Sequence, residues 1–231
     1  MTSEEDAGVT SERVAASLRG FGPLGILAFL AIAAGNLVVA PLSAFLVLVW
    51  ARLSRTPWRD IGYVRPKSWT RDLALGIVFG TAFKLLMKTI VMPVLGADPI
   101  NRTYHYLAGN RAALPGILFA AIIGAGFGEE TVFRGYLFER LRKLLGSGVW
   151  ARSFIVLLTA TLFGLAHYPD QGLAGAEQGT ITGLVFGTIF AVTGQLWMLM
   201  CAHAAFDVTA VAIIYWDLES AVAHLVFKQA A

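Results

Sequence analysis

Two adjacent glutamates and an arginine at the end of an apolar run are the residues of this sequence best suited to chemistry. Arg134 follows Glu130 by four residues, so the two share one face of a helix and are predicted to form an ion pair. Glu129 is rotated by about 100° and has no such local partner. Because charge in an apolar helix is costly, Glu129 is a candidate catalytic acid or base. By spacing alone, a solvated helix end explains the pair equally well.

Polar side chains also interrupt two later apolar segments. His167 lies near the end of one, a turn after Phe163, and His203 and Asp207 stand four residues apart in the other. A single histidine in an apolar helix is more often a core residue than a catalyst. Several ionisable groups on three separate segments must all find partners away from lipid, however, and one shared polar cavity would satisfy them.

Such a cavity would contain the groups that hydrolysis needs. An apolar environment makes a carboxylate a stronger base, which suits Glu129 to take a proton from water. A histidine can donate a hydrogen bond to the oxyanion, or hold a metal ion that stabilises it. Asp207 is placed to orient His203 or to share its proton.

A divalent metal such as zinc is one of two alternatives that these residues leave open. Catalytic zinc usually has three protein ligands; His167 and His203 would supply two of them, and Glu129 or Asp207 the third. The sequence contains no HExxH motif. A metal-free mechanism based on a glutamate fits the same residues.

The composition is that of a membrane protein. Of the 231 residues, 57% are hydrophobic and 14% are charged, against about 25% charged in soluble proteins. The net charge of +3 is small, and no element gathers the basic residues, which argues against nucleic acid as a partner. The single Cys201 can form no intrachain disulfide and is expected to be a small buried hydrophobe.

The hydrophobic pattern predicts an all-α polytopic bundle of about six transmembrane helices over residues 21–216. Residues 1–20 are polar and are expected to form a flexible N-terminal tail, and residues 217–231 a short amphipathic segment. The uncharged stretch 21–50 would reach about 45 Å as a helix, too short for two crossings. It is therefore predicted as one long span with a kink at Pro41.

The loops suggest how the spans are arranged. Six basic residues in 51–72 mark that loop as cytoplasmic. A loop from Asp170 to Thr180, which has no basic residue, is predicted to join the fourth and fifth spans outside, and both termini would also lie outside. Lys84, near the middle of the second span, must snorkel or find a partner inside the bundle.

Three motifs occur in order on separate apolar segments: Glu129-Glu130-x-x-x-Arg134, Phe163-x-x-x-His167 and His203-x-x-x-Asp207. Together they resemble the CPBP (Abi) family of intramembrane proteases, which includes CAAX prenyl endopeptidases and bacteriocin-processing enzymes. The resemblance covers about residues 110–216. The segment 58–63, together with the Pro66-x-Ser68-Trp69 motif, looks like the region that often precedes this core in bacterial members. The resemblance implies an all-helical bundle that lies in the cytoplasmic membrane of a bacterium. This bundle would cleave peptide bonds close to the bilayer.

The resemblance implies a role for each motif residue. Glu129 would activate water, Glu130 and Arg134 would be the supporting pair, and His167 and His203 would line the site. The family is commonly described as metalloproteases.

Asp207 departs from the members that have asparagine at the last motif position. Its negative charge beside Glu129 would favour either a bound cation or a protonated acid.

Three functions compete. The first is an intramembrane endopeptidase acting on a membrane-associated peptide or protein. The second is a non-catalytic membrane scaffold or bacteriocin-immunity-type protein on the same fold, although a scaffold needs no unpaired glutamate in lipid. The third is a transporter that uses Lys84, Glu129 and the histidines as a proton relay; internal repeats would favour it, and the sequence has none.

Overall fold

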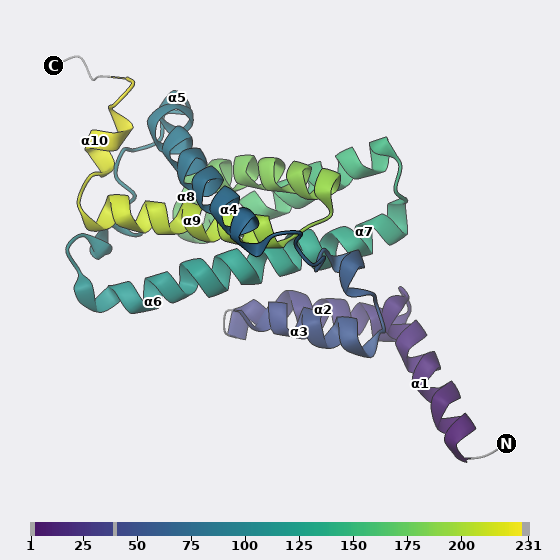
Figure 1. Cartoon of the computed structure of the whole chain (residues 1–231). Helices are drawn as coiled ribbons and strands as arrows, with labels where there is room; N and C mark the ends of the chain where they lie inside the picture. The colour runs from purple at the N-terminus through teal and green to yellow at the C-terminus, as the bar shows by residue number, and fades with distance from the viewer. Residues whose placement is uncertain (1–2, 39–40, 228–231) are drawn as a thin grey trace.

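The protein is a bundle of helices, which confirms the predicted fold class (Figure 1). A computed structural model describes residues 3–38 and 41–227, and no strand occurs among them. The main helices are α1 (Ser3–Arg19), α2 (Pro23–Val38), α3 (Leu42–Leu53), α4 (Trp69–Leu86), α5 (Met92–Val94), α6 (Leu114–Phe119), η5 (Ala120–Leu137), α7 (Phe138–Leu145), α8 (Val149–Thr193), α9 (Trp197–Tyr215) and α10 (Glu219–Ala223).

Four helical stretches are long and apolar enough to cross a membrane. They are Trp69–Val94, Arg111–Leu145, Val149–Thr193 and Trp197–Tyr215. The bent pair Gly8–Arg19 and Pro23–Gly35 can form a fifth span. With the reversal inside α8 described below, this agrees with the prediction of about six spans.

The first apolar stretch folds back on itself. Ser43 Oγ of α3 donates a hydrogen bond to Ile32 O of α2 at 2.5 Å. Gly35 permits this approach, because a Cβ at that position would lie 2.8 Å from Ser43 Oγ. The prediction of a single kinked span is therefore wrong. Helices α2 and α3 lie against each other, and residues 39 and 40 lie outside the described part.

The segment predicted to be a flexible tail is helix α1, apart from residues 1 and 2, which are not described. Glu12 forms ion pairs with Arg19 at 2.7 Å and with Arg55 at 2.6 Å. Arg19 Nη1 also donates a hydrogen bond to Ser54 O at 2.8 Å. Arg55 and Ser54 follow α3, far along the chain, so the polar composition of the segment could not indicate these contacts.

Helices α1 and α10 lie at opposite ends of the molecule (Figure 1). α1 contacts the loop after α3, whereas Glu219 of α10 accepts a hydrogen bond from Asn101 N, in the loop after α5, at 2.7 Å. The membrane orientation with both termini outside stays a prediction. Residues 228–231 of the predicted C-terminal segment lie outside the described part.

Helix α8 contains a sharp reversal in place of most of the predicted loop 170–180. Gly172 has φ 61° and ψ −156°, a conformation that is accessible mainly to glycine. Past this turn, a Cβ on Gly183 would lie 2.7 Å from Ala160 Cα. The two arms of α8 therefore pack antiparallel, and they correspond to the predicted fourth and fifth spans.

Small residues bring α4, α9 and η5 into close contact. A Cβ on Gly76 of α4 would lie 2.8 Å from Met198 O of α9, and a Cβ on Gly126 of η5 would lie 2.9 Å from Ala204 Cβ of α9. Contacts between small residues let membrane helices approach closely. They place the glutamates of η5 beside the histidine of α9.

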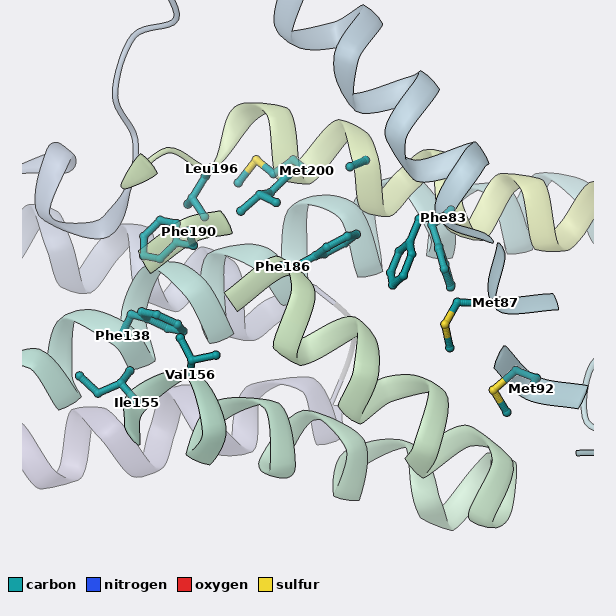
Figure 2. Close-up of a cluster of buried hydrophobic side chains, with 13 residues drawn as sticks. Phe83, Met87, Met92, Phe138, Ile155, Val156, Phe186, Phe190, Leu196 and Met200 are labelled. Atoms are coloured by element: carbon teal, nitrogen blue, oxygen red, sulfur yellow. The ribbon is translucent and has the colours of Figure 1, made fainter. Parts of the chain in front are cut away.

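The apolar core lies next to these contacts (Figure 2). Phe186 of α8 is fully buried and lies between Phe138 and Phe83 in the view of Figure 2. Its ring also packs against His203, with the centroids 5.5 Å apart. The core therefore supports a candidate site residue directly.

Replacing Gly80 by alanine is expected to lower the free energy of unfolding by about 1–3 kcal/mol. The added methyl group would overlap the carbonyl of Ala202 in α9, and Ala202 precedes His203. Thermal unfolding in detergent would measure the loss. Gly116→Ala is the matched control, because nothing lies within 4 Å of a Cβ at that position. Equal melting temperatures for the two variants would contradict this account of the α4–α9 contact.

Candidate active site

Glu130 and Arg134 form the ion pair that their spacing predicts. Arg134 Nη1 donates a hydrogen bond to Glu130 Oε1 at 2.8 Å, and both side chains are buried. The helix η5 is π-helical here, yet a separation of four residues still brings the two side chains together. The guanidinium also lies over the ring of Phe163, 4.6 Å from its centroid.

His203 contacts the same oxygen of Glu130. His203 Nδ1 lies 2.7 Å from Glu130 Oε1. A carboxylate can only accept a hydrogen bond, so Nδ1 carries the hydrogen and donates it. Glu130 therefore accepts from both Arg134 and His203, and it fixes the orientation of the imidazole. The sequence suggested that Asp207 orients the imidazole of His203. In the structure, Glu130 makes the hydrogen bond that does so.

Glu129 takes no part in this network. Its side chain is 27% exposed, and within the described part of the chain its Oε2 has no hydrogen-bond partner. The same oxygen lies 3.7 Å from His203 Nε2, and Asp207 Oδ2 lies 3.8 Å from that nitrogen. The carboxylates of Glu129 and Asp207 therefore both lie near Nε2 of His203 without forming a hydrogen bond to it.

His167 approaches from the first arm of α8. Its Nδ1 lies 2.8 Å from Phe163 O, and because a carbonyl only accepts, Nδ1 is the donor. The ring of Phe163 packs against both histidines, with centroid distances of 4.7 Å to His167 and 5.9 Å to His203. Gly179 makes room for this arrangement, since a Cβ there would lie 3.3 Å from His167 Nδ1.

Four of the sequence-predicted site residues line one cavity of about 270 Å³. They are Glu129, His167, His203 and Asp207. The supporting pair of Glu130 and Arg134 lies behind them, buried in the bundle. The prediction of a shared polar cavity agrees with this arrangement. A concave pocket with a few convergent polar groups is the usual form of an active site.

The donor arrangement does not fit a zinc ion. Among the residues that the structure describes, no three His, Cys, Asp or Glu side chains lie close enough together to hold one metal. His203 uses Nδ1 to contact Glu130 and His167 uses Nδ1 to contact Phe163 O, which leaves Nε2 as the atom of each ring that could bind a ligand. Catalytic zinc usually has three protein ligands, and the described residues do not bring three together around one point.

Several polar residues of the cavity were not recognised from the sequence. They are Gln171 and Gln178 of α8, which lie in the predicted outside loop, and Tyr104 of the segment after α5. Gln178 Oε1 accepts a hydrogen bond from Lys84 Nζ at 3.0 Å. Gln171 precedes the reversal at Gly172 and Gln178 follows it, so their convergence depends on a turn that spacing along the sequence does not indicate.

The segment that precedes the core is joined to the site through Tyr63. Its hydroxyl lies 2.7 Å from Thr131 Oγ1, and that hydroxyl donates in turn to Phe127 O at 2.7 Å. Burial raises the pKa of Tyr63 to about 12, so Tyr63 stays protonated at neutral pH and can donate to Thr131. Leu196 N donates to Gly62 O at 3.0 Å. The segment therefore links η5 to the start of α9.

Comparison with protein families matches residues 111–209 to the family described as type II CAAX prenyl endopeptidase Rce1-like. Comparison with curated proteins and with solved structures gave no match. The matched segment contains every motif residue from Glu129 to Asp207. Residues 111–209 are therefore similar to the CAAX protease (CPBP) family that the motifs resemble.

Proposed function

We propose that this chain is an intramembrane endopeptidase that hydrolyses peptide bonds of membrane-associated peptides or proteins, with Glu129 as the group that activates water. One observation carries the proposal. Of the two adjacent glutamates, Glu130 accepts hydrogen bonds from Arg134 and His203. Glu129 reaches the cavity with a carboxylate oxygen that has no hydrogen-bond partner in the described part of the chain. A carboxylate held in this way is available as a general base.

In the proposed reaction, Glu129 takes a proton from a water molecule while the water oxygen bonds to the carbonyl carbon of the scissile peptide. His167 and His203 line the same cavity. Because Nδ1 of each ring already donates to a protein acceptor, they are candidates to donate from Nε2 to the oxyanion in their doubly protonated form. Glu129 then passes its proton to the amide nitrogen as the C–N bond breaks. Glu129 returns to its carboxylate form, and water is the one co-reactant.

The apolar spans make the chain an integral membrane protein. We propose that it resides in the cytoplasmic membrane of a bacterium, because the segment 58–63 resembles the region before the core in bacterial members. The cavity lies between membrane-spanning helices, which favours substrates that reach it from the bilayer or its surface.

Mass spectrometry of cells tests the proposed activity. A host that lacks the chain would express the wild type, Glu129→Gln or the packing control Gly116→Ala. New C-termini in membrane proteins should appear with the wild type and the control and be absent with Glu129→Gln. A purified sample in liposomes should then cut a peptide that spans one such terminus. If cells with the wild type and cells with Glu129→Gln show the same C-termini, the scaffold alternative would be favoured.

Chelation is expected to leave this activity within about twofold of its starting value. No three ligand side chains converge among the described residues, whereas loss of a catalytic metal would remove its whole contribution to the reaction. Cleavage of the liposome substrate would be measured before and after treatment with EDTA and 1,10-phenanthroline. Loss of cleavage that zinc restores would contradict the metal-free mechanism.

A further inference from the structure

A second cavity of about 250 Å³ adjoins the candidate active site. Lys84, Asn101 and Gln178 belong to the walls of both cavities. Glu129 and His203 line only the first one. A peptide whose scissile bond lies beside Glu129 can therefore continue past Lys84 into the second cavity.

The other charged residues of the second cavity already have partners. Arg102 Nη2 lies 3.0 Å from Asp98 Oδ2. Lys88 Nζ donates a hydrogen bond to Pro99 O and lies 4.0 Å from Glu219 Oε1. Each of these cations has a carboxylate beside it, so neither needs a ligand to balance its charge.

Lys84 differs from them. It is 8% exposed, its Nζ donates to Gln178 Oε1 at 3.0 Å, and it lies 4.7 Å from the centroid of the Phe206 ring. Among residues 3–38 and 41–227, no carboxylate oxygen lies within 4.0 Å of Lys84 Nζ, the distance that an ion pair requires. An amide and an aromatic ring compensate a buried charge only in part. An ionisable residue held at this depth points to a functional role.

We infer that Lys84 binds a carboxylate of the peptide substrate at the junction of the two cavities, an inference that rests on the proposed proteolytic function. An ammonium group has three donors; Gln178 takes one, and two remain for carboxylate oxygens. The incoming group would supply the negative charge that this lysine lacks. The carboxylate is either the free C-terminus of the substrate or an acidic side chain beyond the scissile bond, since both present the same chemistry.

A different role for Lys84 makes a different prediction. Asp207 lines the first cavity together with Lys84, so the lysine could instead act on that carboxylate of the protein. Its replacement would then affect all substrates equally. A substrate carboxylate, by contrast, couples the lysine to one chemical feature of the ligand, and a double-mutant cycle detects such coupling.

Binding to the Glu129→Gln protein tests the inference apart from catalysis. The probes are three dye-labelled apolar tetrapeptides: one with a free C-terminal carboxylate, one with a C-terminal amide, and the same amide with glutamate at its third position. Fluorescence anisotropy in detergent should show that at least one acidic probe binds about 10- to 100-fold more tightly than the plain amide, as expected for a charge-assisted hydrogen bond. The acidic probe that binds identifies the source of the carboxylate.

Adding Lys84→Gln should reduce this ratio to about one, whereas Lys84→Arg, which keeps the charge, should preserve most of it. Lys88→Gln is the matched control, because it changes a lysine that is already paired in the same cavity, and it should leave the ratio unchanged. Equal binding of all three probes, a preference that survives Lys84→Gln, or an equal loss for all probes would overturn the inference. The preference for an acidic probe could depend on Lys84 while the wild-type protein cuts no peptide. That result would count against the proposed proteolysis and not against the carboxylate site.

Discussion

Replacing Glu129 by glutamine is expected to lower kcat/KM for peptide cleavage by about 100- to 10,000-fold, the contribution of a general base. Glutamine has nearly the same shape but cannot take a proton from water. The fold should be almost unaffected, because among the described residues Glu129 Oε2 has no hydrogen-bond partner. The side chain is also 27% exposed, so the exchange leaves no buried charge unpaired.

Cleavage of a peptide identified from cells, by purified protein in liposomes, would measure this loss, and thermal unfolding of the same preparation would measure stability. Glu129→Asp is the matched control, since it keeps a carboxylate and only withdraws it by one methylene. We expect it to retain more activity than the glutamine variant. Near wild-type cleavage by Glu129→Gln would show that another group activates the water.

The parts of the site that could be predicted from the sequence are those that depend on local spacing. Glu130 and Arg134 are one helical turn apart, so their pairing follows from helix geometry alone. The convergence of Glu129 with the two histidines was predicted from the free-energy cost of an ionisable group in lipid. Such groups on apolar segments are expected to meet away from lipid.

The parts that could not be predicted depend on contacts between distant residues. Glu130 and His203 are 73 positions apart, and no pattern in either segment indicates that this glutamate, and not the nearby Asp207, orients the imidazole. Lys84 finds its amide partner 94 positions away. The packing of α2 against α3 depends likewise on one close approach, at Gly35, which hydrophobicity and length do not encode.

Replacing Glu130 by glutamine is expected to lower the free energy of unfolding by about 3–5 kcal/mol, the usual cost of removing one partner from a buried ion pair. Glu130 is 0% and Arg134 is 1% exposed, so water cannot screen the positive charge that remains. His203 would also lose the anionic acceptor of its Nδ1 hydrogen bond, so activity should fall in the protein that still folds. Thermal unfolding would be compared with that of Glu129→Gln, the same chemical change one residue earlier.

The double variant Glu130→Gln, Arg134→Met separates the unpaired charge from lost packing. Because it removes both charges, it leaves none buried without a partner, and methionine fills much of the space of the arginine stem. We therefore expect the double variant to be more stable than Glu130→Gln alone, although its activity should stay low because His203 still lacks its anionic acceptor. If the two substitutions instead destabilise additively, the loss arises from packing, above all from the contact of Arg134 with the Phe163 ring, and Glu130 is not the electrostatic centre of the site.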